Sequence, residues 1–547
     1  MVYLMNTLDL FAPAKLSLKY WKEDLLSGSV VSVVAIPLCL ALAIASGVPP
    51  VHGVYTAIIA GVIVAIFGGS EFGVAGPAAA MTVLLYDTVA KFGFEGLMIA
   101  GFIAGLIQIA LGVTNIGRVV KFIPYVVIVG FTAGIGLLLI LGQIGNLAGI
   151  EMQAQGTFEK AAFLTTSVVK VDLPTLATGI ATLLSIFFVR RFFPRIPASF
   201  AALILITVAV SLINLPVKTI GSIPTSLPSI TFPSFDLSLL GAIFPSAFAI
   251  ALLASIESLL SAVSADGMVG TKHSSSKELV GQGIANMVLP IFSAIPATGV
   301  IVRTATNIKN GAKTRMSAIF HSLILLLVLL FLSPFALTIP VAVLAAILIY
   351  TAFHLISFGE ILSLAKESKG DAAVMFSTIG STIFFDLPTA ILMGFTLAGL
   401  TFMKKMSDSV EVKLVPSMGN TADSPSLALD IEGIARTYRI SGALFFGSAF
   451  ELEKISAETP EKTAPALVLD LLQVDYIDSS SLAILASLAE RHKSKGELYL
   501  AITNATVKKK ILKSHVMNHV DPANIVATVE EGLKKAKAKY GKAENKS

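Results

Sequence analysis

The sequence has little charge and almost no cysteine. Only 14% of its 547 residues are charged, and Cys39 is the single cysteine. One cysteine cannot form a disulfide within the chain or supply the thiolate set of a zinc site. The seven histidines also lack the spacing of metal ligands. The sequence therefore predicts no metal site and no cofactor.

The scarcity of charge is matched by a high content of apolar residues. Hydrophobic residues make up 55% of the chain, and the mean hydropathy is +0.82. This composition excludes an ordinary soluble globular protein. The net charge of +5 does not indicate a nucleic-acid partner, because the basic residues fall in short stretches between apolar segments.

Apolar stretches about as long as a bilayer is thick recur from Leu25 to Met406. We interpret them as about fourteen segments, some too short to cross a bilayer alone. They predict a polytopic α-helical membrane protein in contact with the lipid bilayer. The segments are residues 25–46, 51–68, 76–90, 96–114, 123–149, 173–189, 196–213, 240–262, 277–295, 298–308, 316–334, 340–357, 371–386 and 388–404.

The basic residues between these segments predict an orientation. If Met1 is cytoplasmic, every even-numbered segment ends in the cytoplasm, and Arg190, Arg191, Lys309 and Lys313 then lie on that side. The opposite loops hold only scattered lysines, as the positive-inside rule requires. We therefore expect a multi-pass protein of the plasma membrane (the inner membrane in a bacterium) with both termini in the cytoplasm.

Glycine and proline interrupt two of the apolar segments. The first break is residues 68–77, which contain four glycines and end at Pro77, and the second is residues 294–299, which contain Pro296 and Gly299. They interrupt the third and the tenth segments, which are corresponding positions in two halves of seven. An odd number of spans in each half makes the two halves inverted repeats. Paired breaks of this kind mark the binding site of a transporter.

Each break predicts a helix start at membrane depth, one with Pro77 at its first position and one near Thr298. The first turn of a helix has free N–H groups and the positive end of the helix dipole, and both favour an anion. The two breaks together therefore predict an anion site inside the membrane.

Two ionisable residues lie in these apolar surroundings. Arg303 follows Thr298 by about a turn and a half of helix, and Glu257 interrupts the eighth segment, with Ser261 one turn further along the same face. Ionisable residues at membrane depth are usually functional. We expect Arg303 to attract the anion and Glu257, with Ser261, to carry a coupling ion. The alternative is an ion pair between Glu257 and Arg303 that only stabilises the core.

The character of the chain changes after the last apolar segment. We divide it into a transmembrane domain (1–406), a polar linker (407–425) and a cytosolic α/β domain (426–547), in which strands are expected at 427–431, 437–443, 466–471 and 498–502. The sequence Asp478-Ser479-Ser480-Ser481 precedes a predicted helix. It is interpreted either as an ordinary N-cap or as a phosphate-binding or phosphorylated loop at Ser480.

Several motifs together resemble those of the sulfate permease (SulP) family of anion transporters, over essentially the whole chain. They are residues 37–50 with 53–55, 74–77, 257–267, and 281–283 with Asn286. The C-terminal end is similar to a STAS domain. The resemblance implies a core domain of spans 1–4 and 8–11 that moves against a gate domain of spans 5–7 and 12–14, in a homodimer. It also implies an anion beside Arg303, at Gly76, Ala78, Ala79, Thr298, Gly299 and Val300, and a cytosolic partner of the STAS domain.

The chain departs from the family at informative positions. Many eukaryotic members have glutamine at the position of Leu38 and aromatic residues at those of Leu42 and Ala78, so a halide channel or motor is disfavoured. Antagonist-type STAS domains have glycine at the position of Ser481, which weighs against phosphorylation of the preceding serine. Sodium-coupled bicarbonate members carry aspartate at the position of Glu257, whereas glutamate resembles the proton-coupled members.

These observations favour a secondary active transporter, not an enzyme. We expect proton-coupled symport of a small oxyanion by elevator-type alternating access, with sulfate as the first candidate substrate, dicarboxylates such as fumarate or succinate next, and bicarbonate third. A passive anion channel, a membrane-anchored STAS regulator and a nucleobase permease are the alternatives. The buried Glu257 and the paired breaks argue against a mere anchor, and Arg303 and the STAS domain argue against a nucleobase permease.

Overall fold

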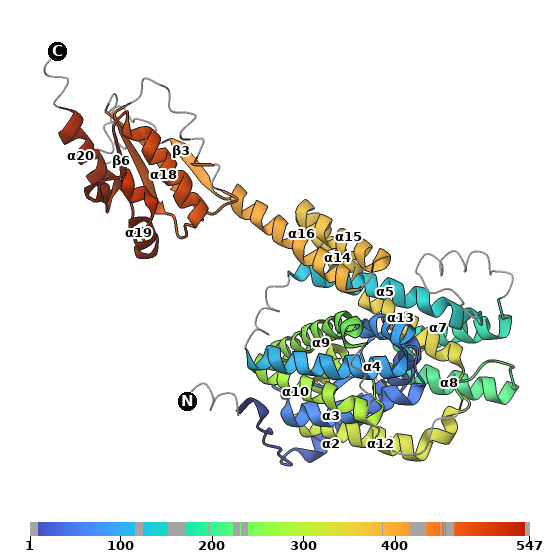
Figure 1. Ribbon diagram of the computed structural model, residues 1–547. Helices are drawn as coiled ribbons and strands as arrows, with labels where there is room; N and C mark the ends of the chain where they lie inside the picture. The colour runs from blue at the N-terminus through green and yellow to red at the C-terminus, as the bar shows by residue number, and fades with distance from the viewer. Residues whose placement is uncertain are drawn as a thin grey trace. The chain divides into compact units, whose positions relative to one another are not determined.

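The computed structural model describes residues 9–114, 124–150, 171–194, 196–221, 230, 239–385, 387–414, 434–448, 451–452, 455 and 464–541. The chain forms two compact units, Met1–Thr396 and Leu397–Ser547. The first unit is helical, and the second contains a five-stranded sheet (Figure 1). Each unit is described by itself below.

The predicted apolar segments form helices. In the described residues they are α2 (Trp21–Ala45), α3 (Pro50–Phe67), α4 (Thr82–Val113), α5 (Tyr125–Ala148), α7 (Leu173–Phe192), α8 (Ala198–Ile213), α9 (Leu240–Val269), α10 (Ser275–Val288), α11 (Ile301–Lys309), α12 (Met316–Ala336), α13 (Val341–Leu355), α15 (Lys369–Phe384) and α16 (Leu387–Asp408). Seven helices in the described part of the chain are long and apolar enough to cross a membrane. The prediction of a polytopic helical membrane protein is confirmed. A further short helix, α14 (Phe358–Glu367), was not predicted.

The third and fourth predicted segments follow one another within α4. Their junction is Gly93, whose backbone is not helical, with φ 70° and ψ −176°. A Cβ atom at Gly93 would meet no neighbour within 4 Å, so space is not the reason for glycine there. The positive φ is the reason, because other residues rarely adopt it.

The two breaks lie side by side, as the inverted repeat predicts. Strand β1 (Ala75–Gly76) in the first break pairs antiparallel with β2 (Thr298–Gly299) in the second. Each follows the second helix of its half: β1 comes after α3, and β2 comes after α10. This pairing satisfies backbone groups that would otherwise have no partner at membrane depth.

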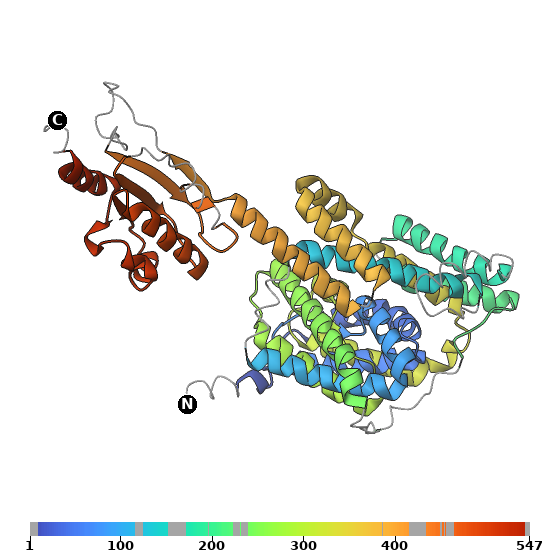
Figure 2. The ribbon, with the colours of Figure 1, turned by 45° about the horizontal axis from the view of Figure 1, so that its top comes forward.

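The membrane helices pack in two groups, which match the core and the gate. In the core, α4 packs on α9 and α10, while α2 packs on α3 and α12 (Figures 1 and 2). In the gate, α5 packs on α13 and α15, and α7 packs on α8 and α13. We call the contact of core helix α2 with gate helices α8 and α13 the core–gate seam.

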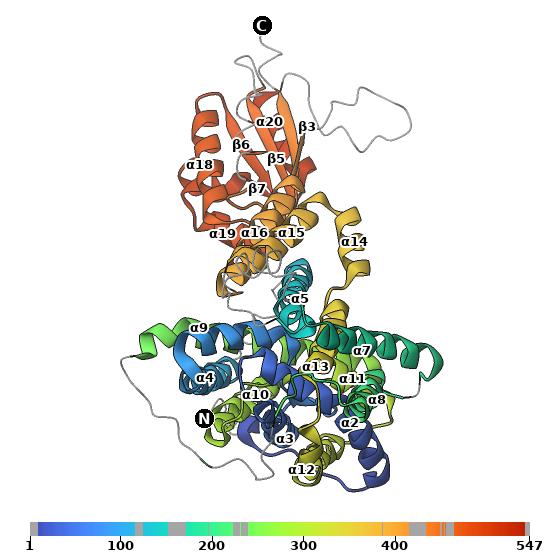
Figure 3. The same cartoon turned by 90° about the vertical axis from the view of Figure 1, so that its right-hand side faces the viewer.

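The second unit is built on a sheet with the strand order β3-β4-β5-β6-β7. Its strands are β3 (Glu411–Leu414), β4 (Ala435–Ser441), β5 (Ala466–Gln473), β6 (Glu497–Ala501) and β7 (Ile525–Val526). Strand β3 is antiparallel to β4, and the other pairs are parallel. The sheet is drawn with its helices, in orange and red, in Figure 3.

Side chains of the central strand β5 alternate between two apolar layers. Leu467 and Leu469 belong to the layer that contains residues of α18 (Ser479–Lys493) and α19 (Ala505–Leu512). Val468 belongs to the layer that contains residues of α20 (Val529–Tyr540). Because successive strand residues point to opposite faces, both faces of the sheet are covered by helices.

The sheet contains two strands that the sequence analysis did not predict, β3 and the two-residue β7. Strand β3 lies at 411–414, inside the range 407–425 that was predicted to be a polar linker. None of its four residues is buried, so the sequence pattern gave no signal for it. The strand expected at 427–431 lies outside the described residues.

Candidate anion site between two helix starts

Helix α9 holds the second break through two hydroxyl groups. Thr298 Oγ1 donates to Ala254 O, at 3.0 Å, and lies 3.0 Å from Ser258 Oγ. Ser258 Oγ in turn accepts from Gly299 N at 2.9 Å. Thr298 and Ser258 are fully buried. These bonds fix the backbone of β2 before α11 begins.

Helix α10 holds both breaks from one face. Near its start, the Glu278 carboxylate accepts from Gly69 N at 2.8 Å and from Ser70 N at 2.9 Å. Two turns later Asn286 donates to Ala297 O at 3.0 Å and accepts from Ala297 N at 2.8 Å. Residues eight apart lie on the same side of a helix. Asn286 was part of a family motif, but its role as the anchor of the second break was not predicted.

The two helix starts have no side-chain cap. Val300 is the N-cap of α11, and Ala78 is the N-cap of the 3₁₀ turn η1 (Ala79–Met81) that leads into α4. Neither residue type has a side-chain acceptor for the first N–H groups of its helix. The N-terminal N–H groups are therefore not closed off by the residue before them.

Both starts differ in position from the prediction. Helix α11 begins at Ile301, because Thr298 is held in β2, and Arg303 therefore lies in its first turn rather than a turn and a half inside. Pro77 precedes η1 instead of occupying its first position. The β1–β2 pairing keeps both segments extended for longer than the sequence indicated.

Arg303 lies between the two breaks and is 1% exposed. Its Nη2 donates to Pro77 O of the first break and to Cys39 Sγ of α2, each at 3.3 Å. Its Nε and Nη1 have no hydrogen-bond partner among the described residues. A Cβ atom at Gly76 would lie 2.2 Å from Nη1, so the close approach of the guanidinium requires glycine at that position.

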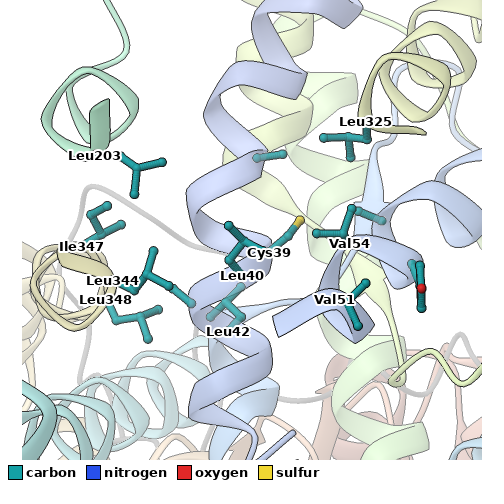
Figure 4. Close-up of a cluster of buried hydrophobic side chains, with 14 of the residues drawn as sticks. Cys39, Leu40, Leu42, Val51, Val54, Leu203, Leu325, Leu344, Ile347 and Leu348 are labelled. Carbon is teal, nitrogen blue, oxygen red and sulfur yellow. The ribbon is translucent and has the colours of Figure 1, made fainter. Parts of the chain in front are cut away.

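Cys39 comes from an apolar cluster, and its contact with Arg303 was not predicted. Figure 4 shows its sulfur beside Leu40, Val54 and Leu325. A thiol in such surroundings is usually a packing residue. No sequence pattern distinguishes this cysteine from one that only packs.

Glu257 does not pair with Arg303 in the described residues. Its Oε2 is buried and has no hydrogen-bond partner, and the same is true of Arg303 Nε and Nη1. The alternative of an ion pair that only stabilises the core is therefore wrong for this structure. Each residue holds a buried polar atom that the described protein groups do not satisfy.

Ser261 bonds to α11 rather than to Glu257. Its Oγ donates to Thr304 Oγ1 at 3.0 Å, and Thr304 Oγ1 also accepts from Val74 N at 3.1 Å. Ser261 therefore connects α9, α11 and the first break. Its role in ion coupling stays a prediction.

In the second unit, the helix start at α18 is capped by Asp478. One carboxylate oxygen accepts from Ser481 N and the other from Phe446 N, both at 2.8 Å. Ordinary N-capping, one of the two interpretations left open, describes this geometry. Ser480 is exposed in the first turn, and its phosphorylation stays a prediction.

Comparisons with known proteins cover the chain almost end to end. The model of the sulfate permease family matches residues 21–378, and the model of the STAS domain matches residues 428–532. The chain is 37% identical over 523 residues to the "Putative sulfate transporter YvdB" of Bacillus subtilis, covering 92% of this chain and 97% of that protein. It is 30% identical over 541 residues to the "Bicarbonate transporter BicA" of Synechocystis sp., covering 95% of each.

Solved structures agree with the fold. The transmembrane domain of a cyanobacterial bicarbonate transporter BicA matches 70% of this chain and 99% of that chain, with a TM-score of 0.65 and 30% identity. The overall structure of SLC26A9 matches 100% of this chain and 96% of that chain, with a TM-score of 0.87 at 17% identity, which speaks for the fold alone. The chain therefore belongs to the sulfate permease family and carries a STAS domain in its C-terminal part.

Proposed function

We propose that the chain is a secondary active transporter that takes up a small oxyanion together with a proton. Sulfate is the first candidate substrate. Membership of the sulfate permease family and the 37% identity to a putative sulfate transporter support it. Dicarboxylates such as fumarate or succinate come next, and bicarbonate third.

One observation carries this proposal: Arg303 is buried, Glu257 has a buried carboxylate oxygen, and the two do not pair with each other. Glu257 Oε2 and Arg303 Nε and Nη1 have no hydrogen-bond partner among the described residues. Leaving buried charged groups unsatisfied is costly, so such groups are expected to have partners in the working protein. In a transporter the transported species are these partners. The anion binds the guanidinium and the uncapped helix starts, and the proton binds the carboxyl group.

Coupling follows from electrostatics. An anion bound between the breaks increases the Coulomb cost of a negative charge on Glu257, so a bound anion favours a bound proton there. Linkage makes the effect reciprocal, so a proton on Glu257 strengthens anion binding. The two species then cross the membrane together.

Movement of the core against the gate provides alternating access. The core group carries both breaks, Arg303 and Glu257. A core that shifts past the gate as one body takes the loaded site with it, as in an elevator. We further propose a homodimer with both termini in the cytoplasm, and a cytosolic partner for the STAS domain. A periplasm-active reporter fused to the C-terminus should stay silent, and a strong signal would reverse the orientation.

The competing function is sodium-coupled bicarbonate uptake. It is favoured by the 30% identity to a cyanobacterial protein named as a bicarbonate transporter. A passive channel on the same fold is a further alternative. The proposed transporter, the sodium-coupled transporter and the passive channel differ in what drives accumulation. A proton gradient drives the first, a sodium gradient drives the second, and the channel does not accumulate its anion.

Uptake by purified protein in proteoliposomes tests the proposal. Labelled sulfate, fumarate, succinate and bicarbonate are offered with a proton gradient, with a sodium gradient, and with neither. We expect sulfate to accumulate when the outside is more acidic. Accumulation driven only by sodium, or equilibration without accumulation under every gradient, contradicts the proposal.

A further inference from the structure

A cavity of about 510 Å³ lies at the core–gate seam. Its walls come from core helices α2, α3 and α12 and from gate helix α8. Figure 4 shows three of its lining residues, Leu40 of α2, Leu203 of α8 and Leu325 of α12, on separate helices. The volume falls in the range of about 300–1,000 Å³ in which proteins bind small molecules.

The lining excludes an oxyanion and disfavours water. No charged residue is among the described residues that line the cavity, and their hydroxyl groups are those of Ser32, Thr207 and Thr338. Ser32 Oγ already donates to Gly28 O at 2.8 Å. An anion needs several converging donors, and apolar cavities stay dry but bind apolar molecules. The occupant should therefore be a hydrocarbon.

The cavity is continuous with the lipid-facing surface of the helices. Two of its lining residues, Ile204 and Val208 of α8, are 47% and 50% exposed. Leu205 of α8 and Leu327 of α12 are also exposed, but they do not line the cavity. In a membrane-spanning helix, exposed apolar residues face the acyl chains of the bilayer. Hydrocarbon is thus present at the mouth of the cavity.

We propose that this cavity holds the acyl chain of a membrane phospholipid, inserted between α8 of the gate and α2 and α12 of the core. Close packing is the norm in protein interiors, so a bilayer chain is expected to fill an apolar space of this size that opens to the lipid. The chain lies between the two groups that must slide past each other. Its length and shape then affect how readily the core moves.

Photocrosslinking tests the site directly, without reference to the transported anion. The full-length protein is reconstituted with a phospholipid that carries a diazirine in the middle of one acyl chain, and labelled residues are mapped by mass spectrometry. We expect labels on buried lining residues such as Leu203 and Leu329, in addition to the exposed surface. Labels confined to exposed residues such as Leu205 and Leu327 overturn the proposal.

Two neighbouring substitutions provide a matched pair. Val328→Trp should fill the cavity and lower labelling of Leu203 at least fivefold, whereas Leu327→Trp, on the lipid-facing side of the same helix, should leave it unchanged. Equal labelling in both variants contradicts the proposal. The mapping in the unsubstituted protein decides the question if Val328→Trp does not fold.

A third variant separates an acyl chain from a polar occupant. Thr207 Oγ1 is buried and has no hydrogen-bond partner among the described residues. Thr207→Val keeps the shape of the side chain and removes the hydroxyl. An acyl chain predicts labelling of Leu203 that is unchanged or stronger. A loss of labelling in Thr207→Val shows an occupant held by the hydroxyl and overturns the proposal.

Discussion

Two helices in this chain, α18 and α11, differ in whether a side chain caps the N–H groups of their first turn. At α18 of the STAS domain, the Asp478 carboxylate accepts from Ser481 N and from Phe446 N, so the local protein groups satisfy one another. At α11 the N-cap is Val300, which has no side-chain acceptor, and Arg303 in the first turn keeps two nitrogen atoms without partners among the described residues. We call the first start, which has a side-chain cap, closed, and the second, which has none, open.

The difference shows that the sequence around a helix start does not by itself define an anion site. The serine-rich start of α18 looked suitable for phosphate, yet its cap uses the available N–H group of Ser481. The start of α11 is surrounded by valine and isoleucine, yet Arg303 Nε and Nη1 in its first turn lack partners among the described residues. The variants below test this contrast, from the largest expected effect on anion binding to the smallest.

Arg303→Ala should cause the largest loss of anion affinity. Losing a charge-assisted contact in a desolvated site costs about 1.5–3 kcal/mol, roughly ten- to a hundredfold in affinity. Arg303→Lys should recover only part, because an ammonium group cannot reproduce the planar guanidinium. Equilibrium binding of labelled sulfate measures the effect. Unchanged affinity in a folded Arg303→Ala protein would place the site elsewhere.

Gly76→Ala should act through Arg303. The new Cβ would lie 2.2 Å from Nη1, so the guanidinium must move away from the first break. We expect a loss of roughly tenfold in affinity, smaller than that of removing the charge. Gly142→Ala on α5 is the matched control, because a Cβ there meets nothing within 4 Å. Equal behaviour of the two variants would contradict the placement of Arg303.

Ser258→Ala should weaken the second break. It removes the acceptor of Gly299 N and the partner of Thr298 Oγ1. Losing such a bond costs about 0.5–1.5 kcal/mol, so we expect a two- to tenfold loss of affinity. Ser46→Ala, whose hydroxyl donates to Leu42 O at the end of α2, serves as the control. The binding assay would contradict this role of Ser258 if both variants matched the parent.

Asp478→Ala should leave anion affinity unchanged and destabilise the STAS domain. Loss of an N-cap costs about 0.5–2 kcal/mol. Hydrogen exchange of the α18 amides should become faster, whereas Ser480→Ala, which changes an exposed side chain, should have little effect. Loss of sulfate affinity in Asp478→Ala would link the closed start to transport and break the contrast.

The sequence predicted the parts of the site that follow from backbone and charge. Glycine and proline located both breaks, and their positions in two halves of seven predicted that they meet. A single arginine and a single glutamate in long apolar stretches identified Arg303 and Glu257. These signals are strong because the membrane makes broken backbone and isolated charge costly.

The remaining features depend on tertiary packing. Whether Glu257 reaches Arg303 is decided by how α9 and α11 pack, and the sequence left an ion pair open. Small polar residues such as Ser258 usually bond within their own helix, so their contacts across helices are not visible in a sequence pattern. Strand β3 is exposed and short, and it was included in the predicted linker for that reason.

The central claim is that the unpaired Glu257 carries the coupling proton, and Glu257→Gln tests it most directly. The amide mimics the protonated side chain, so the variant should still bind sulfate, with an affinity that depends less on pH. In proteoliposomes with a proton gradient, the parent should concentrate labelled sulfate and acidify the interior during uptake. Glu257→Gln should do neither while still exchanging labelled for unlabelled sulfate. If the variant concentrates sulfate on a proton gradient as the parent does, the proton is carried by another group and the account is contradicted.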